Sequence, residues 1–463
     1  MNTSPLSRRS FVKSGSVLSA GLALTPYVSK GLTDDQPIRI GVVGCGGRGC
    51  GAVGNAMAAD PKVELVAIGD LFEDRIQQRS NYLAKICGTR YKVSEENKFT
   101  GFDCYKKVID AGVDYVILAS PPAFRPAQLE YAVKKGIHCF FEKPVAVDAP
   151  GIRKVIELAK KAKEKKLGFM SGFCWRYNYP KRAVFSRVLD GAVGDINAMY
   201  STYNAGEVGG KRGRTGTQSD LEIQLRNWPK HLWLAGDSIV EQAVHSIDMM
   251  QWAMGEELPL EAEGSGGRQV YPDDPDRYGN IFDHFAVVYK WANGGRGYHF
   301  SRQQNGTQGS YELEIFGTKG FCSAKNKHAI FPYQIEQKPE VILPKVSGFH
   351  RVRGKSIPMR IPRAQKSSAN APWRYSDRNN DMYKTEHEEL IASIRSGEPI
   401  NDGERAANST MVAIMGRMVA YTGKKLTFQQ ALNSKEDLSP PHLDFGKPLS
   451  VPAVPKPGLT KFI

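Results

Sequence analysis

The chain has 463 residues, too many for one ordinary domain, so two domains are expected. With 41% hydrophobic and 24% charged residues, its composition is that of a folded globular protein, and no apolar run is long enough to span a bilayer. The formal charge of +15 comes from basic residues scattered along the sequence. This pattern indicates a solvated basic surface, and we expect no nucleic-acid partner.

The first 35 residues have the features of a targeting segment. Ser7-Arg8-Arg9-Ser10-Phe11-Val12-Lys13 is a twin-arginine signature, and a short, mildly apolar stretch follows it. We therefore expect export across a bacterial inner membrane to the periplasm, with no membrane insertion beyond this segment. No clean small-residue cleavage site follows, so cleavage and anchoring both remain open. A chance arginine pair in a disordered tail is the alternative.

Residues 38–70 form the most informative stretch, because a strand, a glycine turn, a helix and a second strand follow one another. Gly44 permits a tight turn, Gly46 allows a pyrophosphate to approach the backbone, and Gly49 lets the helix pack closely on the strand. Asp70 ends the second strand, where it can accept hydrogen bonds from a ribose diol and repel a 2′-phosphate. The pattern predicts NAD as cofactor and disfavours NADP. A glycine turn in another α/β domain is the alternative.

Strand and helix signals alternate from residue 36 to 167, which predicts an α/β domain with a doubly wound parallel sheet. After residue 196 the sequence becomes β-rich, with turns such as Asn293-Gly294-Gly295, which indicates an antiparallel α+β domain. We place this second domain at 168–435. Residues 436–463 are rich in proline and are predicted to be an extended tail.

Two further clusters could perform chemistry. In the first, Glu142, Lys143 and Pro144 follow an apolar strand at the sheet edge where such folds bind ligands, so Lys143 could hold a proton for a reacting oxygen. An exposed Glu-Lys pair is the structural alternative. In the second, a helix over 238–254 would place Glu241, His245 and Asp248 on one face.

The Glu241–His245–Asp248 face could bind a metal, but a metal site needs further ligands, and the sequence shows no second cluster. We expect no metal. The two carboxylates are predicted instead to orient the His245 imidazole and to raise its basicity.

These motifs together resemble the Gfo/Idh/MocA family of glucose–fructose oxidoreductases and inositol dehydrogenases. The resemblance covers nearly all of residues 36–435 and includes the segment from His387 to Glu404. It implies an N-terminal Rossmann domain and a C-terminal α+β domain with a large, mostly antiparallel sheet. It also implies a homodimer or homotetramer formed through that sheet, and NAD(P)-dependent oxidation of sugars or polyols.

Carried over position by position, the resemblance assigns roles to individual residues. The implied cofactor contacts are Gly44, Cys45, Gly46, Gly47, Arg48, Gly49, Asp70, Ser120, Pro121, Glu142 and Lys143. Lys143 and His245 match the catalytic positions, and the implied substrate contacts are Arg176, Tyr177, Glu241 and Asp248. Many family members have aspartate where this chain has Glu241. The carboxylate is kept but is one methylene longer, so its hydrogen bond to a substrate hydroxyl is not carried over unchanged.

Our first hypothesis is that the protein is an exported NAD-dependent dehydrogenase for a sugar, glycoside or polyol. In it, His245 is the base and Lys143 is the proton donor to the alkoxide. Because little NAD is free in the periplasm, we expect the cofactor to stay bound. An NAD-dependent glycosidase that works by transient oxidation and elimination is the second hypothesis. A non-catalytic binding protein of the same fold is the third.

Overall fold

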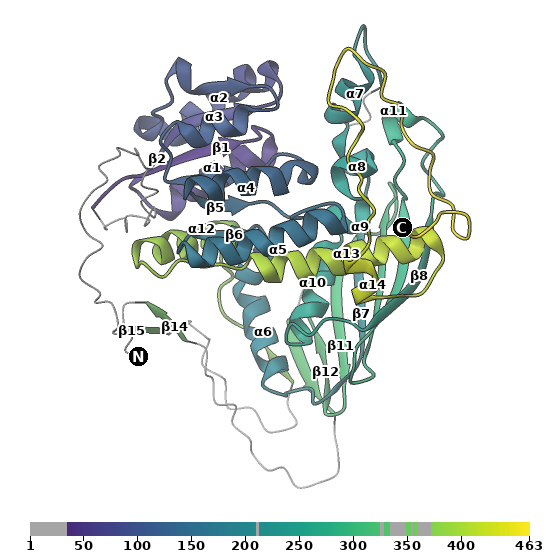
Figure 1. Cartoon of the computed structure of the whole chain (residues 1–463). Helices are drawn as coiled ribbons and strands as arrows, with labels where there is room; N and C mark the ends of the chain where they lie inside the picture. Colours follow the sequence, from purple (N-terminus) through teal and green to yellow (C-terminus); the bar gives the residue numbers. More distant parts are fainter. Residues whose placement is uncertain (1–34, 210–212, 325–327, 334–348, 353–354, 359–371) are drawn as a thin grey trace, which may run out of the picture.

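The computed structural model describes residues 35–209, 213–324, 328–333, 349–352, 355–358 and 372–463. The predicted signal segment therefore lies outside the described residues, apart from Asp35. Figure 1 shows two parts, an α/β unit that starts the chain and a broad sheet that follows it. No helix in the described ranges has both the length and the apolarity required to cross a membrane.

The first part is a Rossmann fold, as predicted. Its sheet, in the order β3-β2-β1-β4-β5-β6, is parallel throughout the described residues. The strands are β1 (Ile38–Val43), β2 (Val63–Asp70), β3 (Lys98–Thr100), β4 (Tyr115–Leu118), β5 (His138–Phe141) and β6 (Phe169–Ser171). The last strand lies beyond residue 167, where the sequence placed the domain boundary.

Helices cover both faces of this sheet, which is why its strands are apolar on both sides. One face carries α1 (Gly47–Ala59) and α2 (Glu73–Cys87), and the other carries α3 (Cys104–Asp110), α4 (Arg125–Lys135) and α5 (Ala149–Glu164). A short 3-10 helix, η4 (Cys174–Tyr177), and α6 (Tyr179–Leu189) then lead into the second part.

The second part is built on a mixed sheet in the order β16-β13-β12-β11-β7-β10-β9-β8-β17. Only β7 and β10 pair in parallel among its described strands, so the prediction of a mostly antiparallel sheet is confirmed. The strands are β7 (Ile196–Ala205), β8 (Glu261–Gly267), β9 (His284–Lys290), β10 (Arg296–Gln303), β11 (Ser310–Gly317), β12 (Gly320–Ser323), β13 (Ala329–Pro332), β16 (Trp373–Arg374) and β17 (Leu426–Thr427). The strands β14 (Phe349–Val352) and β15 (Lys355–Pro358) form a separate antiparallel two-stranded sheet.

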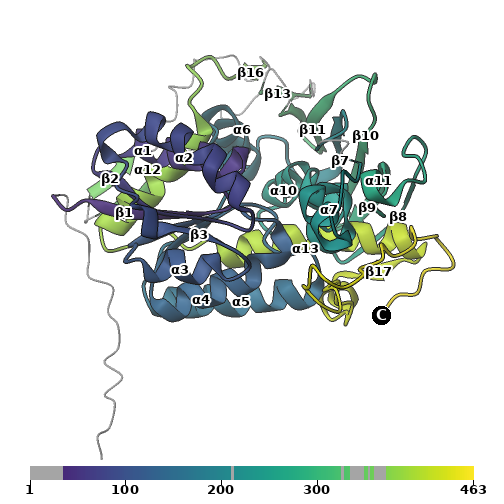
Figure 2. The ribbon, with the colours of Figure 1, turned by 90° about the horizontal axis from the view of Figure 1, so that it is seen from above.

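The segment between β7 and β8 is helical: α7 (Asp220–Arg226), the 3-10 helix η5 (Trp228–Lys230), α8 (Leu232–Ala235), α9 (Ser238–Glu241) and α10 (Val244–Ala253). A single turn, α11 (Pro275–Tyr278), precedes β9. The helices α9, α10 and α13 (Gly403–Thr422) contact strands of the large sheet and lie on its inner face (Figures 1 and 2).

The C-terminal helices return to the first part. The helix α12 (Met382–Arg395) packs on α1, and α13 packs on α5 as well as on β8 (Figure 2). After α14 (Phe428–Leu432), the remaining residues to 463 contain no helix or strand. The two parts therefore share one continuous architecture, and the chain crosses between them more than once.

Candidate functional site

The glycine loop after β1 has the geometry that a nucleotide-binding turn requires. Gly44 adopts φ +93°, and a Cβ there would lie 2.6 Å from the Ala119 carbonyl carbon. A Cβ on Gly49 would lie 1.9 Å from the Gly44 carbonyl oxygen. Neither position can carry a side chain without moving the loop away from β4. The helix α1 begins at Gly47, so its N-terminus faces the space above the loop.

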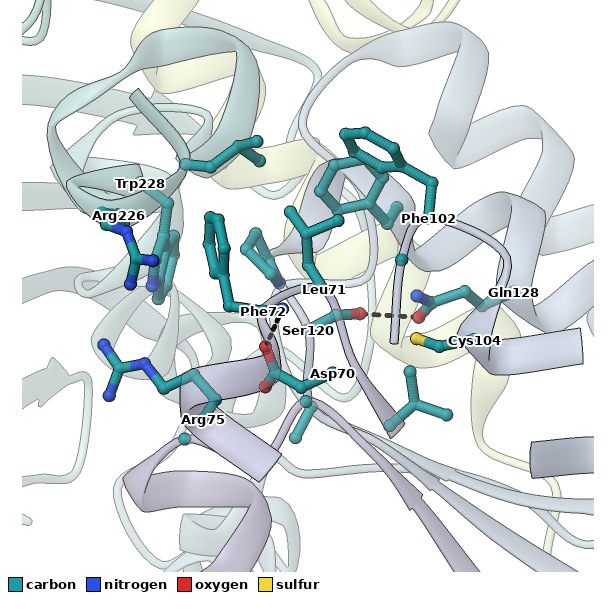
Figure 3. Close-up of a pocket in the computed structure, with 18 of the residues that line it drawn as sticks. Asp70, Leu71, Phe72, Arg75, Phe102, Cys104, Ser120, Gln128, Arg226 and Trp228 are labelled. Carbon is teal, nitrogen blue, oxygen red and sulfur yellow. Dashed lines mark hydrogen bonds between the residues drawn. The ribbon is translucent and has the colours of Figure 1, made fainter. Parts of the chain in front are cut away.

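A cavity of about 280 Å³ opens above this loop (Figure 3). Asp70 borders it from the end of β2, where its Oδ2 accepts the Cys45 N–H at 2.7 Å and its Oδ1 accepts the Phe72 N–H at 3.1 Å. Burial raises the pKa of Asp70, and these backbone hydrogen bonds oppose the rise. The carboxylate is thus held rigidly at the position where the sequence predicts a ribose.

Several predicted cofactor residues meet at this cavity and others do not. Those that line it are Gly44, Gly46, Gly47, Asp70, Ser120 and Pro121. Those that do not line it are Cys45, Arg48, Gly49, Glu142 and Lys143. Cys45 is fully buried and contributes its backbone N–H to Asp70, so its part in this cavity is to shape the loop.

Arg48 points to the end of β5 and not into the cavity. Its Nε donates to Glu142 Oε1 at 2.5 Å, and its guanidinium lies 4.8 Å from the centre of the Tyr383 ring. A second acid, the fully buried Glu386, has Oε1 3.9 Å from Arg48 Nη2. Arg48 therefore holds two acidic side chains together and positions Glu142 beside Lys143.

The roof of the cavity comes from the second part of the chain, which the sequence analysis missed. Leu225, Arg226 and Trp228 line the cavity. Figure 3 shows Arg226 and Trp228 on the side away from Gln128 and Cys104. The two terminal nitrogens of Arg226 each donate to one oxygen of Asp74 at 3.2 Å, and its guanidinium lies 4.0 Å from the centre of the Phe72 ring. These partners are 152 positions apart, so no local motif marks them.

The C-terminal tail holds the same roof. Phe445 stacks on Phe102, a cavity residue, with ring centres 5.6 Å apart. Gln224 on α7 donates to the Leu449 carbonyl at 2.7 Å. The Leu449 side chain is buried in an apolar cluster with Leu221 and Leu225. The tail is therefore bound across α7 and over the cavity rim.

Lys143 follows β5, and its ammonium reaches across to the second part. Its Nζ donates to the Glu241 carbonyl at 2.5 Å and lies 3.2 Å from Glu241 Oε1. Both side chains are about 90% buried, with exposed fractions of 12% and 11%. The pair joins the edge of the Rossmann sheet to the end of α9.

His245 lies beside this pair, but not on the continuous helix that the sequence predicted. The helix is interrupted at Gln242 and Ala243, so Glu241 ends α9 and His245 belongs to α10. The imidazole stacks on Trp175 with ring centres 5.0 Å apart. Its Nδ1 is sealed from solvent and has no hydrogen-bond partner in the described structure.

The predicted rise in His245 basicity is wrong. Burial lowers its pKa well below the usual value, and the nearby Lys143 ammonium lowers it further. Asp248 acts in the opposite direction but is the weaker influence. Glu241 gives its carboxylate to Lys143 and Gln242. His245 is therefore neutral at pH 7.

Arg176 and Asp248, both predicted substrate contacts, bind each other instead. Arg176 Nε and Nη2 each donate to one Asp248 oxygen at 2.8 Å, and Arg176 also pairs with Glu256. Asp248 Oδ1 accepts a further hydrogen bond from Ser409 at 2.7 Å. Both side chains are buried in this network, and their contact with a substrate stays a prediction.

Tyr177, the remaining predicted substrate contact from this stretch, is also buried. Its side chain lies beneath Arg182, whose guanidinium is 4.8 Å from the ring centre, and only 6% of Tyr177 is exposed. Trp175, which is also in η4, stacks on His245. In the sequence, the signal for this contact with His245 is an aromatic residue, Trp175, two positions before Tyr177.

Comparison with known proteins agrees with this architecture. The family described as "Oxidoreductase family, NAD-binding Rossmann fold" matches residues 38–170, and its "C-terminal alpha/beta domain" matches residues 206–427. The myo-inositol 2-dehydrogenase of Thermotoga maritima is 22% identical over 388 residues, which cover 84% of this chain and 96% of that protein.

A glycosyl hydrolase family 109 protein of Solibacter usitatus is 26% identical over 214 residues, which cover 43% of this chain and 46% of that protein. Among solved structures, the aldose-aldose oxidoreductase of Caulobacter crescentus has a TM-score of 0.60 at 16% identity, and the match covers 85% of this chain and all of that one. This chain is therefore a member of the Gfo/Idh/MocA family of NAD-binding oxidoreductases.

Proposed function

We propose that the protein transfers hydride between NAD and a secondary hydroxyl of a sugar, glycoside or polyol. The observation that carries this proposal is the meeting of a lysine ammonium and a neutral, buried imidazole at the carboxyl edge of the Rossmann sheet. The similarity to an inositol dehydrogenase supports the substrate class.

The residues around the cavity fit a dinucleotide. Gly44 and Gly49 have no room for a Cβ, α1 turns its N-terminus to the loop, and Asp70 offers a fixed carboxylate. When bound, NAD supplies the hydride acceptor. Because Nδ1 of His245 is sealed, Nε2 is the nitrogen left to accept the hydroxyl proton, while Lys143 Nζ stabilises the developing alkoxide.

A direct assay tests this function. The purified protein is incubated with NAD and a panel of myo-inositol, glucose and methyl glucoside, and NADH is followed by its absorbance. We expect at least one compound to reduce NAD. If none does, and a nitrophenyl glycoside is cleaved without net NADH, the second candidate replaces the first: a glycosidase that uses NAD transiently. The similarity to a glycosyl hydrolase family 109 protein favours that candidate.

We also propose that NAD is preferred over NADP, because Asp70 would repel a 2′-phosphate. Asp70→Ala is expected to weaken NAD binding by about tenfold or more and to narrow the gap between the two cofactors. Titration calorimetry with NAD and NADP measures both effects. Asp70→Asn, which keeps one oxygen for the backbone N–H groups, separates charge from loop support. Equal affinities in the unaltered protein would contradict the preference.

The roof supports a further proposal, that NAD stays bound between turnovers. Arg226→Ala removes the two hydrogen bonds between α7 and Asp74 and is expected to raise the NAD dissociation rate roughly three- to tenfold, the scale of a partly exposed ion pair. Stopped-flow displacement of bound NADH measures the rate. Arg214→Ala is the matched control. Arg226 bridges Asp74 and Glu222, and Arg214 likewise bridges two carboxylates but does not line the cavity. An equal effect of both substitutions would contradict the proposal.

We further propose that the protein is exported by its twin-arginine segment and that it is a homodimer or homotetramer. Support for an assembly comes from the outer face of the large sheet, where Tyr200, Tyr298, Phe300 and Phe316 are each more than one-third exposed. Neighbouring aromatic side chains on one uncovered face are typical of an interface.

A further inference from the structure

A chain of hydrogen bonds extends from Lys143 into the large sheet. Glu241 Oε1 lies 3.2 Å from Lys143 Nζ, and Glu241 Oε2 accepts from Gln242 Nε2 at 2.5 Å. Gln242 Oε1 in turn accepts from the Tyr203 hydroxyl at 3.0 Å. No sequence motif singles out Gln242 or Tyr203, yet both are connected to the proposed reactive centre through Glu241.

The direction of this chain is fixed by its chemistry. The Glu241 carboxylate only accepts, so the Gln242 amide must turn its NH₂ group toward it. The amide oxygen then faces the opposite way, toward a donor, and Tyr203 provides that donor. Loss of the phenol hydroxyl would leave the amide oxygen without this partner and free the amide to rotate.

The Tyr203 ring is itself held in place. It lies on the inner face of β7, opposite Tyr311 in the β7–β11 register, and the two rings meet edge to face at 4.7 Å. Trp175, which stacks on His245, lies on it with ring centres 6.3 Å apart. The hydroxyl of Tyr203 is therefore presented from a packed, rigid surface.

Glu241 needs such support because of its length. A glutamate side chain has three rotatable bonds, so a single contact with Lys143 leaves its carboxylate several orientations. Gln242 occupies the second oxygen and restricts the carboxylate to the orientation in which the first oxygen meets Lys143. Glu241 thus contacts the Lys143 ammonium, and Gln242 in turn fixes the Glu241 carboxylate.

We propose that Gln242 and Tyr203 are positioning residues, which act through Glu241 to fix the Lys143 ammonium where it stabilises the developing alkoxide. This inference rests on the proposed dehydrogenase function. It predicts that the effects of the two residues on kcat are not additive, because Tyr203 acts only through Gln242 and Gln242 only through Glu241. A merely structural role predicts independent contributions to stability and no link to Glu241.

The test is a set of double-mutant cycles on the NAD-bound protein, with the most active compound of the myo-inositol, glucose and methyl glucoside panel. Tyr203→Phe and Gln242→Met are each expected to lower kcat roughly three- to tenfold, the scale of one hydrogen bond, with little change in NAD affinity. The double variant should be no slower than Gln242→Met alone. In a Glu241→Gln background, Tyr203→Phe should have no further effect on kcat.

Tyr311→Phe is the matched control, since Tyr311 packs on the same ring but takes no part in the chain of hydrogen bonds, and it should leave kcat unchanged. Multiplicative effects of Tyr203→Phe and Gln242→Met, or an unchanged kcat in both, would overturn the inference. If Lys143→Ala also leaves turnover unchanged, Lys143 has no part in the reaction. If no compound of the panel reduces NAD even with the unaltered protein, the proposed function itself fails. If Lys143→Ala alone slows turnover, only the positioning role fails.

Discussion

Lys143→Ala is expected to lower kcat for NAD reduction by roughly two to four powers of ten. This is the usual scale for losing a group that acts on the reacting oxygen in the transition state. The substitution removes the ammonium held by Glu241, while the glycine loop and Asp70, which form the proposed NAD site, remain intact. NAD binding should therefore persist. Initial rates and the NAD released on denaturation are the two measurements.

The control for this variant is Lys154→Ala, since Lys154 is an exposed lysine on α5 that pairs with Glu130 far from the proposed centre. It should leave kcat and NAD content unchanged. A melting temperature for each variant separates lost chemistry from lost folding, because Glu241 is left without its ion pair. An unchanged rate in Lys143→Ala would remove lysine from the proposed mechanism.

His245→Asn is the second large effect, and we expect a loss of similar size, because asparagine cannot accept the hydroxyl proton. The pH profile gives a sharper result. A base must be unprotonated, and the His245 pKa lies well below its usual value of 6.5. The acidic limb of kcat/KM should therefore fall below pH 6.5, with activity retained as pH drops through that value and lost only further down.

The same variant separates a base from a metal ligand. For a base, chelators should not reproduce the loss, and added zinc or manganese should not restore activity. Elemental analysis showing about one tightly held transition metal per chain would contradict this assignment. An acidic limb above pH 6.5 that is still present in His245→Asn would show that another group titrates.

The sequence predicts the nucleotide loop well because the required contacts are local. Gly44 and Gly49 are separated by a single turn, and the clash that excludes a side chain at Gly49 is with Gly44 itself. The position of Asp70 can be predicted because only one helix and one strand, α1 and β2, separate it from the loop. The fold class is confirmed for the same reason, since the alternation of apolar strands and helices is visible without knowledge of distant partners.

The surroundings of Arg176, Asp248 and His245 could not be predicted as well, because these side chains contact residues that are distant in the sequence. Arg176 and Asp248 were expected to face a substrate, but each satisfies the other from 72 positions away. The break after Glu241 carries no glycine or proline to mark it. The low pKa of His245 depends on burial and on Lys143, which only the assembled structure brings near.

The position of α12 has a consequence for how the protein is made. Leu390, Ile391 and Ile394 belong to the apolar cluster beneath α1 and β1, and His387 Nδ1 lies 2.7 Å from the Tyr115 hydroxyl. The nucleotide-binding half thus starts the chain but is completed by residues near its end. During synthesis it must wait, partly uncovered, until those residues emerge. Retention of the dinucleotide would then report that synthesis has passed α12 and that α12 has packed on α1.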